Sequence, residues 1–404
     1  MSQAAFYALW GFVFVLPWDP LANLPVVGSI PRIVGLVASA AGMLHILARR
    51  RVRPLSWFHV FAVLFVLWAG VSTFWSIDPD ATRLRFITYL QLLVLVWLLW
   101  EIAWSPERQR ALLQAYVLGV CVAAVATIHN YLSGDPWLSQ GTWETTRFVA
   151  LEQDPNELGV ILALGLPMAW YLGLAQAQRG ATWVWRLYMP LGITGILLTA
   201  SRGAFLSALV ALVIVPWTLG RVPLRTKVVL YALAVGSLML ATSFVPEASL
   251  ERIQSTRADI EAGYFGGRIH TWMAGLEVAR EHPLAGVGAG GFGAAVAPTL
   301  HEAMASHQTY LEILVEQGIV GLLLFLALVA AVITPLRYLP VLERRLWIVL
   351  LASLAVGSMS LHLGHRKQSW FVMGLLAAQV ALRPARTPVS RPLTVRVPHG
   401  PRLR

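Results

Sequence analysis

Several cations at the ends of apolar segments are the residues of this sequence best suited to chemistry. Arg202, in TASRGAF, falls where one apolar run ends and the next begins, between Ser and Gly. A cation near the membrane is costly unless it is paired or reaches the head groups, so such residues are functional candidates. Guanidinium groups hold phosphate oxygens through two hydrogen bonds, which suits a pyrophosphate. The other candidates are Arg32, Arg83, Arg85, Arg147, Arg268, Arg366 and Lys367, each of which could instead simply contact lipid head groups.

His307 is the best candidate for a general base. It directly precedes the apolar run 310–336, at a boundary between lipid and water. Histidine titrates near neutral pH and can accept a proton from an attacking hydroxyl. A role in capping the helix or contacting head groups is the simpler alternative. Four further histidines lack a comparable context and receive no role here: His282, His301, His362 and His365.

Acidic residues occur in short motifs before apolar runs. Asp154 and Asn156, in EQDPNELG, form a helix-start signal with Pro at an early helical position, so capping is the simplest interpretation. Two pairs, Asp78 with Asp80 and Glu152 with Asp154, have the spacing of acids that can hold Mg²⁺ or Mn²⁺. The first pair is explained more simply as a turn and helix cap. The stretch GVGAGG lacks the βαβ context of a nucleotide-binding motif.

The elements that position these residues are expected to be membrane-spanning helices. The chain has 404 residues, 57% hydrophobic and only 13% charged, whereas a soluble domain carries roughly 25% charge. This composition excludes secreted domains, disordered chains and nucleic-acid binders, despite a net charge of +11. Cys121 is the lone cysteine, so no disulfide framework or thiolate metal site is expected. The N-terminal MSQAAFYALW has no positive leader region, so it is expected to remain as a first span.

About twelve apolar segments follow one another along the chain, and runs this long must be helical in lipid. They lie near 4–17, 30–48, 55–75, 84–104, 110–132, 155–176, 181–199, 204–219, 227–245, 310–336, 341–361 and 369–383.

The distribution of Lys and Arg among the short loops predicts that both termini are cytoplasmic. The cations assigned to the inner side are Arg49, Arg50, Arg51, Arg53, Arg108, Arg110, Arg179, Arg221, Arg225, Lys227, Arg337, Arg344 and Arg345. A tail over 384–404, rich in Arg and Pro, is expected on the same side. This asymmetry accounts for most of the positive net charge.

Two outward segments are longer than a turn, about 133–154 and about 246–308. Loops of this length are usually functional. The second contains a predicted amphipathic helix, Arg268–Glu281, with Ile269, Trp272, Met273 and Leu276 on one face; such a helix could lie on the membrane surface. It leads into HPLAGVGAGGFG.

Four ordered motifs resemble bacterial O-antigen ligases. His307 to Leu311, with Gly318 seven residues after Leu311, is similar to their His-(Asn/Ser/Gln)-x-x-Leu-x₆-Gly signature. TASRGAFLSAL is similar to their Ser-Arg segment, and EQDPNELG to their Asp-Pro-Asn element. FGGRIHTW followed by EHPLAGVGAGGF is similar to the Gly-Arg…Trp and His-Pro-Leu-x-Gly-x-Gly run of their large periplasmic loop. The motifs extend over about 145–325.

The resemblance implies an all-α polytopic protein with a GT-C-like glycosyltransferase domain over 1–383. A large, partly helical periplasmic loop would lie between the ninth and tenth spans. Such an enzyme would transfer O-antigen from undecaprenyl pyrophosphate to a hydroxyl of the lipid A–core oligosaccharide. The reaction would be inverting, independent of metal and without a cofactor, at the periplasmic face of the inner membrane. Besides these two substrates only membrane lipids are expected as partners, with no nucleic acid.

The resemblance also assigns residues. Its essential arginines correspond to Arg202 and Arg268, and its essential histidine to His307. The remaining expected contacts to the donor pyrophosphate or the acceptor are Arg147, Asp154, Asn156, Gln308 and Tyr310.

Four alternatives stay open from sequence. An O-antigen polymerase and a protein O-oligosaccharyltransferase would use the same donor; the His-Gln-x-x-Leu element with one large late loop favours the ligase over the first, and the short tail over the second. A transporter of lipid-linked sugars would more often show repeated halves. A metal-dependent glycosyltransferase would use Asp78 and Asp80, and chelator sensitivity would reveal it.

Overall fold

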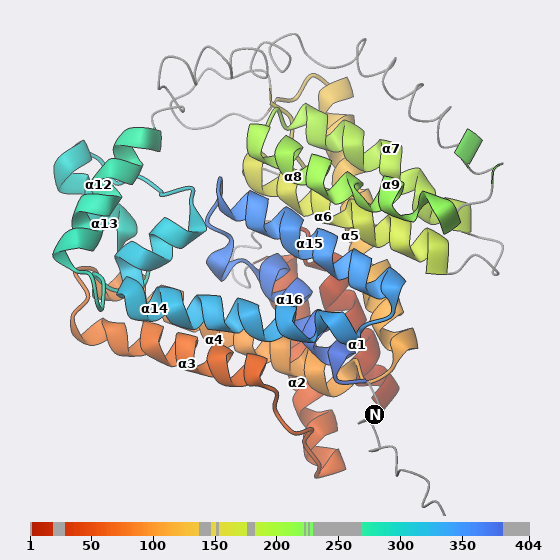
Figure 1. The fold of residues 1–404 in the computed structure, drawn as a ribbon, viewed down its shortest axis with the longest axis horizontal. Coiled ribbons are helices and arrows are strands. Elements are labelled where there is room, and N and C mark those ends of the chain that lie inside the picture. The colour runs from red at the N-terminus through yellow and green to blue at the C-terminus, as the bar shows by residue number, and fades with distance from the viewer. Residues whose placement is uncertain are drawn as a thin grey trace, which may run out of the picture.

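The computed structural model describes residues 2–18, 29–136, 147–150, 153–175, 182–221, 224, 227–228 and 268–382. Within these ranges the chain is helical, with turns and loops and no strand (Figure 1). Several predicted segments lie outside the described residues: all but the first two residues of 227–245, all of 246–267 in the large loop, most of the stretch 137–152, and the tail 384–404. Arg179, Arg225 and Glu152 lie outside them as well.

The predicted apolar segments other than 227–245 coincide with helices. In the first half these are α1 (Ser2–Val15), α2 (Ile30–Arg49), α3 (Trp57–Val71), α4 (Pro79–Ile102), α5 (Pro106–Leu132), α6 (Pro155–Ala175), α7 (Thr182–Leu198), α8 (Arg202–Leu212) and α9 (Ile214–Thr218). In the second half they are α14 (Thr309–Ile333), α15 (Val341–Ser358) and α16 (Lys367–Val380), preceded by α12 (Arg268–Glu281) and α13 (Phe292–Leu300). The bounds of α12 are those predicted from sequence.

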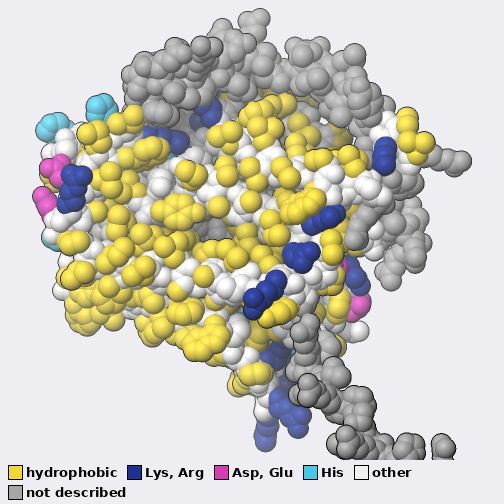
Figure 2. All heavy atoms as spheres, viewed as in Figure 1, with side chains coloured by type: hydrophobic (Ala, Val, Ile, Leu, Met, Phe, Trp, Pro, Cys, Tyr) yellow, Lys and Arg dark blue, Asp and Glu magenta, His cyan; other side chains and the backbone are white. Residues whose placement is uncertain are grey.

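Six of the described helices are long and apolar enough to cross a membrane: α2, α3 with its 3₁₀ extension, α4, α5, α6, and α14 with the 3₁₀ turn after it. Shorter apolar helices are α1, most of α7, and α8 with α9. Hydrophobic side chains cover most of the face seen in Figure 2, as expected where lipid surrounds the protein. The chain is therefore a multi-pass membrane protein, and a total of twelve spans stays a prediction.

Helix α6 forms the centre of the packing. It is apolar on all sides and buried along nearly its whole length, which is typical of a helix enclosed by others. It contacts α5, α7, α8 and α15. Gly159 allows the start of α8 to approach, because a Cβ there would overlap Ala204. The polar N-terminal end of α6 thereby packs against the start of α8.

Helix α14 is broken at Gly318, whose φ of 65° and ψ of −170° are not helical. The backbone amides of Val287 and Gly288 donate to the carbonyls of Val315 and Glu316, at 3.0 and 2.8 Å. A Cβ at Gly318 would overlap the Leu284 backbone. This glycine thus lets the loop after α12 dock into a break in the helix.

Helix α12 buries its small residues Thr271, Ala274 and Gly275 against the rest of the protein. Met273 and Leu276 of the predicted apolar face stay exposed. Together with α13, this helix lies at one end of the bundle, beside the start of α14 (Figure 1).

Candidate active site

Five helix N-termini meet at one end of the bundle: those of α6, α8, α12, α14 and α16. The contacts that join them are given below. A helix N-terminus carries unsatisfied N–H groups and a partial positive charge, so it attracts anions. The convergence of five such ends creates a region suited to a strongly negative ligand.

The start of α6 is held by two of the predicted residues. Asp154 Oδ1 accepts hydrogen bonds from the amides of Asn156 and Glu157, at 2.8 and 3.1 Å, so Asp154 caps the helix as expected. Arg147 is buried and donates to Asn156 Oδ1 (2.9 Å) and to the Thr199 carbonyl (3.0 Å). Arg147 and Asn156 thus connect the start of α6 to the end of α7.

Ser360 contacts Arg268 and the residue that follows Arg202. Arg202 is the first residue of α8, which Ser201 caps by accepting from the Ala204 amide. The next residue, Gly203, contacts Ser360 so closely that a Cβ would overlap its side chain. Arg268 begins α12 and donates from Nη1 to the Ser360 carbonyl, at 3.3 Å.

The charged groups around Arg268 have opposite effects on its pKa. Burial lowers the pKa of Arg268, the Asp154 carboxylate raises it, and the Arg202 cation lowers it further. Arginine nevertheless stays charged in proteins. Two guanidinium cations are therefore held close together with one carboxylate near them, which favours binding of an additional anion.

His307 lies in the turn that leads into α14, with a left-handed φ of 46°. The turn is anchored by Trp272, which donates to the Ser306 carbonyl at 2.9 Å. The His307 ring is 5.5 Å from the His362 ring, and its Nδ1 is buried without a hydrogen-bond partner among the described residues. Burial, followed by the Arg268 cation and His362, lowers the pKa of His307 to about 4. The side chain is therefore a neutral imidazole at neutral pH and can accept a proton.

His362 connects His307 to the partly buried acid Glu157. Its Nε2 is 3.2 Å from Glu157 Oε1, and Arg366 contacts both side chains. Glu157 is in the first turn of α6 and Arg366 directly precedes α16. These contacts join the ends of α6, α14 and α16.

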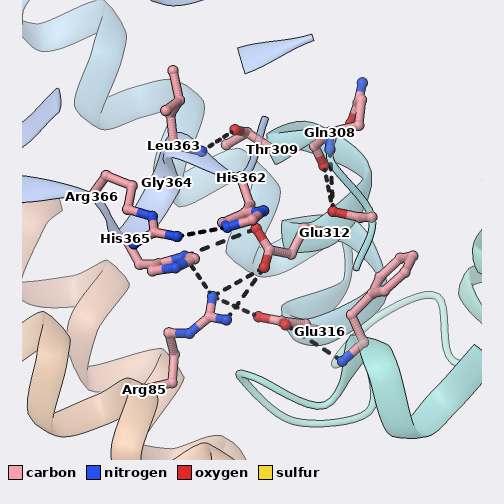
Figure 3. A network of polar contacts seen from close by, with 12 residues as sticks. Arg85, Gln308, Thr309, Glu312, Glu316, His362, Leu363, Gly364, His365 and Arg366 are labelled. Atoms are coloured by element: carbon pink, nitrogen blue, oxygen red, sulfur yellow. Dashed lines mark hydrogen bonds and ion pairs between the residues drawn. The ribbon is translucent and has the colours of Figure 1, made fainter. Parts of the chain in front are cut away.

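A second group of charged side chains, from α4 and α14, lies beside His362 and Arg366 (Figure 3). The His362 and His365 rings stack with their centroids 5.3 Å apart, and Arg85 Nη1 is 2.8 Å from His365 Nδ1. Arg85 also pairs with Glu312 at 3.3 Å and Glu316 at 3.5 Å. Burial and the nearby arginines hold the pKa of His365 well below its usual value. Charged side chains of α4 and α14 are thus linked through His365 to His362.

Gln308 and Tyr310 lie apart from the arginines. The side chain of Gln308 caps α14 by accepting from the Leu311 amide. Tyr310 lines an apolar cavity of about 310 Å³ between α14, α15 and α16, together with Phe325 and Ser358. A part in holding the pyrophosphate stays a prediction for both.

The outward acidic pair Asp78 and Asp80 serves α4. Asp78 caps the helix by accepting from the Ala81 amide at 3.0 Å, as the simpler interpretation expected. Asp80 is exposed and lies 3.9 Å from Arg83. In the described part of the chain, no three His, Cys, Asp or Glu side chains are grouped as they would be around a metal ion.

Sequence reasoning missed part of this site. His362 and His365 received no role, yet both belong to the polar network beside His307. Glu312 and Glu316 were not considered at all. Two acids one turn apart in an otherwise apolar helix are a signal that could have identified them, because such residues are rare in membranes and need partners.

Comparisons with known proteins agree with the sequence motifs. Residues 187–326 match the family described as O-Antigen ligase, and this range contains Arg202, Arg268 and His307. The chain is also similar to the exopolysaccharide production protein ExoQ of Rhizobium meliloti (strain 1021), with 28% identity over 296 residues. The alignment covers 67% of this chain and 62% of ExoQ, so the chain spans less than two thirds of that relative.

Proposed function

We propose that this chain, which carries the O-antigen ligase family domain over residues 187–326, transfers a glycan from undecaprenyl pyrophosphate to a hydroxyl of the lipid A–core oligosaccharide. The observation that supports this most directly is the meeting of five helix N-termini with Arg202 and Arg268 beside a neutral His307. A lipid-linked pyrophosphate supplies the anion that such a region attracts.

In the proposed reaction the acceptor hydroxyl oxygen attacks the anomeric carbon of the donor sugar. The bond from that carbon to the pyrophosphate oxygen breaks, and undecaprenyl pyrophosphate leaves with the bonding electrons. Attack opposite the leaving group inverts the anomeric centre. The hydroxyl proton passes to a ring nitrogen of His307, so atoms and charge balance.

Arg202 and Arg268 would stabilise the charge that develops on the leaving phosphates. A pyrophosphate already departs readily, and what lowers the barrier is neutralisation of its growing charge by preorganised donors. The Arg268 guanidinium is held by the Ser360 carbonyl before substrate arrives, and Arg202 is the first residue of the capped helix α8. Little reorganisation is then needed during the reaction.

Donor binding would also make His307 a stronger base. The Arg268 cation contributes to the low pKa of the free protein's histidine. Phosphate charges bound at Arg268 would offset this cation and favour the protonated imidazole. The proton acceptor would therefore strengthen when the donor is in place.

A second candidate is polymerisation of a lipid-linked glycan. The similarity to ExoQ, an exopolysaccharide production protein, favours a reaction that lengthens a polysaccharide. The same donor site and base would serve, and only the acceptor would differ. For either reaction we place the site at the periplasmic face of the inner membrane, with both termini cytoplasmic.

A transfer assay with two acceptors separates these candidates. Purified protein in nanodiscs would receive a radiolabelled undecaprenyl-pyrophosphate glycan together with lipid A–core. We expect label on lipid A–core, and we expect Arg202→Ala to abolish it while the protein is still produced. Lengthening of the lipid-linked glycan with unmodified lipid A–core would instead establish the polymerase. Absence of both products would contradict glycosyl transfer and favour a transporter.

A further inference from the structure

A second cationic cavity lies on the opposite side of the loop that carries His362. It has a volume of about 670 Å³ and is lined by α2, α4, the start of α16 and Phe12 of α1. Three cations line it: Arg32, Arg366 and Lys367. Among the lining residues that the structure describes, none carries a carboxylate. The cavity therefore has a positive lining that the candidate active site does not account for.

The cavity is elongated along the helices. Its lining runs from Ser29 to Ser39 on α2 and from Thr88 to Leu98 on α4, ten residues on each helix, or roughly 15 Å at a rise of about 1.5 Å per residue. That is about half of a hydrocarbon core of roughly 30 Å. The depth matches a chain lying in one leaflet of the bilayer.

The cations lie at one end of this cavity and the apolar residues extend towards the other. Arg32 is in the first turn of α2, and Lys367 is the first residue of α16. At the far end Leu98 packs against Gly42 of α2. A polar head with a hydrocarbon tail fits this division, since the head would meet cations and the chain would meet apolar side chains.

The loop 360–366 separates this cavity from the active-site arginines. On one side Ser360 accepts from Arg268, and the His362 ring faces His307. On the other side His365 and Arg366 line the cavity. The protein thus has two cationic regions back to back, each suited to a phosphate.

We propose that this cavity binds a membrane lipid whose head is a phosphomonoester, with its chain lying between α2 and α4. A phosphomonoester carries about −1.5 to −2 charges at neutral pH, whereas the phosphodiester of an ordinary phospholipid carries one. Arg366 is paired with Glu157 outside the cavity. The guanidinium and ammonium groups that line the cavity carry several N–H donors, which suits the three terminal oxygens of a phosphomonoester better than the two of a phosphodiester. This binding is separate from the proposed transfer and does not depend on it.

Equilibrium binding of tritiated dodecyl phosphate to the purified full-length protein in a neutral detergent tests the proposal. We expect saturable binding that unlabelled dodecyl phosphate displaces and that dodecanol or phosphatidylglycerol, at the same concentration, does not. The double variant Arg32→Gln with Lys367→Gln should weaken binding at least tenfold, because it removes two of the three cations. Both residues lie near helix starts at the cavity's cationic end, and neither belongs to the apolar core, so the fold should be retained.

Two single variants serve as controls. Arg83→Gln removes an exposed cation of α4 that does not line the cavity, and binding should be unchanged. Arg202→Gln reports on the active-site region, and it too should leave dodecyl phosphate binding unchanged. Equal competition by phosphatidylglycerol would mean ordinary lipid contact and overturn the proposal. Loss of binding in Arg202→Gln, with full binding in the double variant, would place the phosphate in the active site and overturn it as well.

Discussion

His307 has a backbone conformation that few residues other than glycine adopt. Its φ of 46° costs about 1–2 kcal/mol for an L-residue. Ala200, directly before the Ser201 cap of α8, has a similar φ of 48°. Strained residues of this kind concentrate at functional sites, and here one is the proposed base itself and the other lies two residues before Arg202. The strain agrees with the site proposed from side-chain chemistry.

The low pKa of His307 predicts the pH dependence of transfer. A group with a pKa of about 4 is neutral, and competent as a base, from neutral pH down to about pH 4. Replacing His362 by Gln removes one of the groups that lower this pKa, so it should rise. We expect kcat/KM of His362→Gln to fall at a higher pH than that of the wild type, measured over pH 4–8. If kcat/KM of His362→Gln falls at the same pH as that of the wild type, or at a lower pH, the role given to His362 is contradicted.

Arg85 and Arg83 form a matched pair on α4 because only one of them is buried. The Arg85 side chain is 17% exposed and pairs with Glu312 and Glu316, whereas that of Arg83 is 70% exposed. Removing one partner of a buried ion pair costs about 3–5 kcal/mol, and an exposed pair contributes about 0–1 kcal/mol. We expect Arg85→Gln to lower the temperature at which the purified protein aggregates. Arg83→Gln should match the wild type; equal effects of the two variants would show that the Arg85 network is not stabilising.

At the scale of the elements, the break in α14 lets the loop after α12 contact the helix that begins just after His307. Gly318 opens the helix, and the carbonyls of Val315 and Glu316 then accept from Val287 and Gly288. Glu316 Oε1 also lies 3.4 Å from the Phe292 amide. The helix that begins just after His307 is thus joined to the outward helices α12 and α13, and the position of Arg268 depends on this docking.

Gly318→Ala should destabilise the protein strongly. The φ of 65° with ψ of −170° lies in a region almost confined to glycine and costs other residues about 1–3 kcal/mol. The new Cβ would also overlap the Leu284 backbone, which cannot yield as a side chain does. We expect a large loss of folded protein after heating, measured by size-exclusion chromatography. Gly220→Ala is the control, because a Cβ there meets nothing within 4 Å. Similar survival of both variants would show that the break does not need glycine.

The sequence alone predicted the positions of the helices better than the contacts between them. Apolar length located the helices, and Asp78 and Asp154 were identified as caps because Asp followed by Pro is a local signal. The roles of Gly318 and of the histidines after α15 depend on contacts between distant segments, such as Gly318 with Leu284. Hydrophobicity and spacing contain no direct information about such contacts. The same limit explains why the partners of Arg85 were not anticipated.

At the scale of the whole molecule, the two ends of the bundle differ in chemistry. One end carries α12, α13 and the five helix starts, and the other carries the turn after α14 with Arg337 (Figure 1). The positive-inside rule places the second end in the cytoplasm. The candidate site would then face the periplasm, where both lipid substrates of the proposed reaction would meet it.

Cysteine labelling in spheroplasts tests this orientation. Cys121 is replaced by Ser, and Met273→Cys or Arg337→Cys introduces one exposed thiol at either end. We expect a membrane-impermeant maleimide to label the Met273→Cys protein in intact spheroplasts, and the Arg337→Cys protein only after permeabilisation. The reverse pattern would place the candidate site on the cytoplasmic side and exclude a periplasmic ligase.

The measurement that tests the central claim most directly is glycan transfer by the purified protein in the presence of EDTA. Wild type, His307→Ala and the control His270→Ala, an exposed histidine of α12, would be compared with undecaprenyl-pyrophosphate glycan and lipid A–core. We expect product from the wild type and the control despite the chelator. The rate for His307→Ala should be lower by about 10²–10⁴ because the general base is lost. Undiminished transfer by His307→Ala, or loss of wild-type transfer in EDTA, would contradict a mechanism based on arginine and histidine alone.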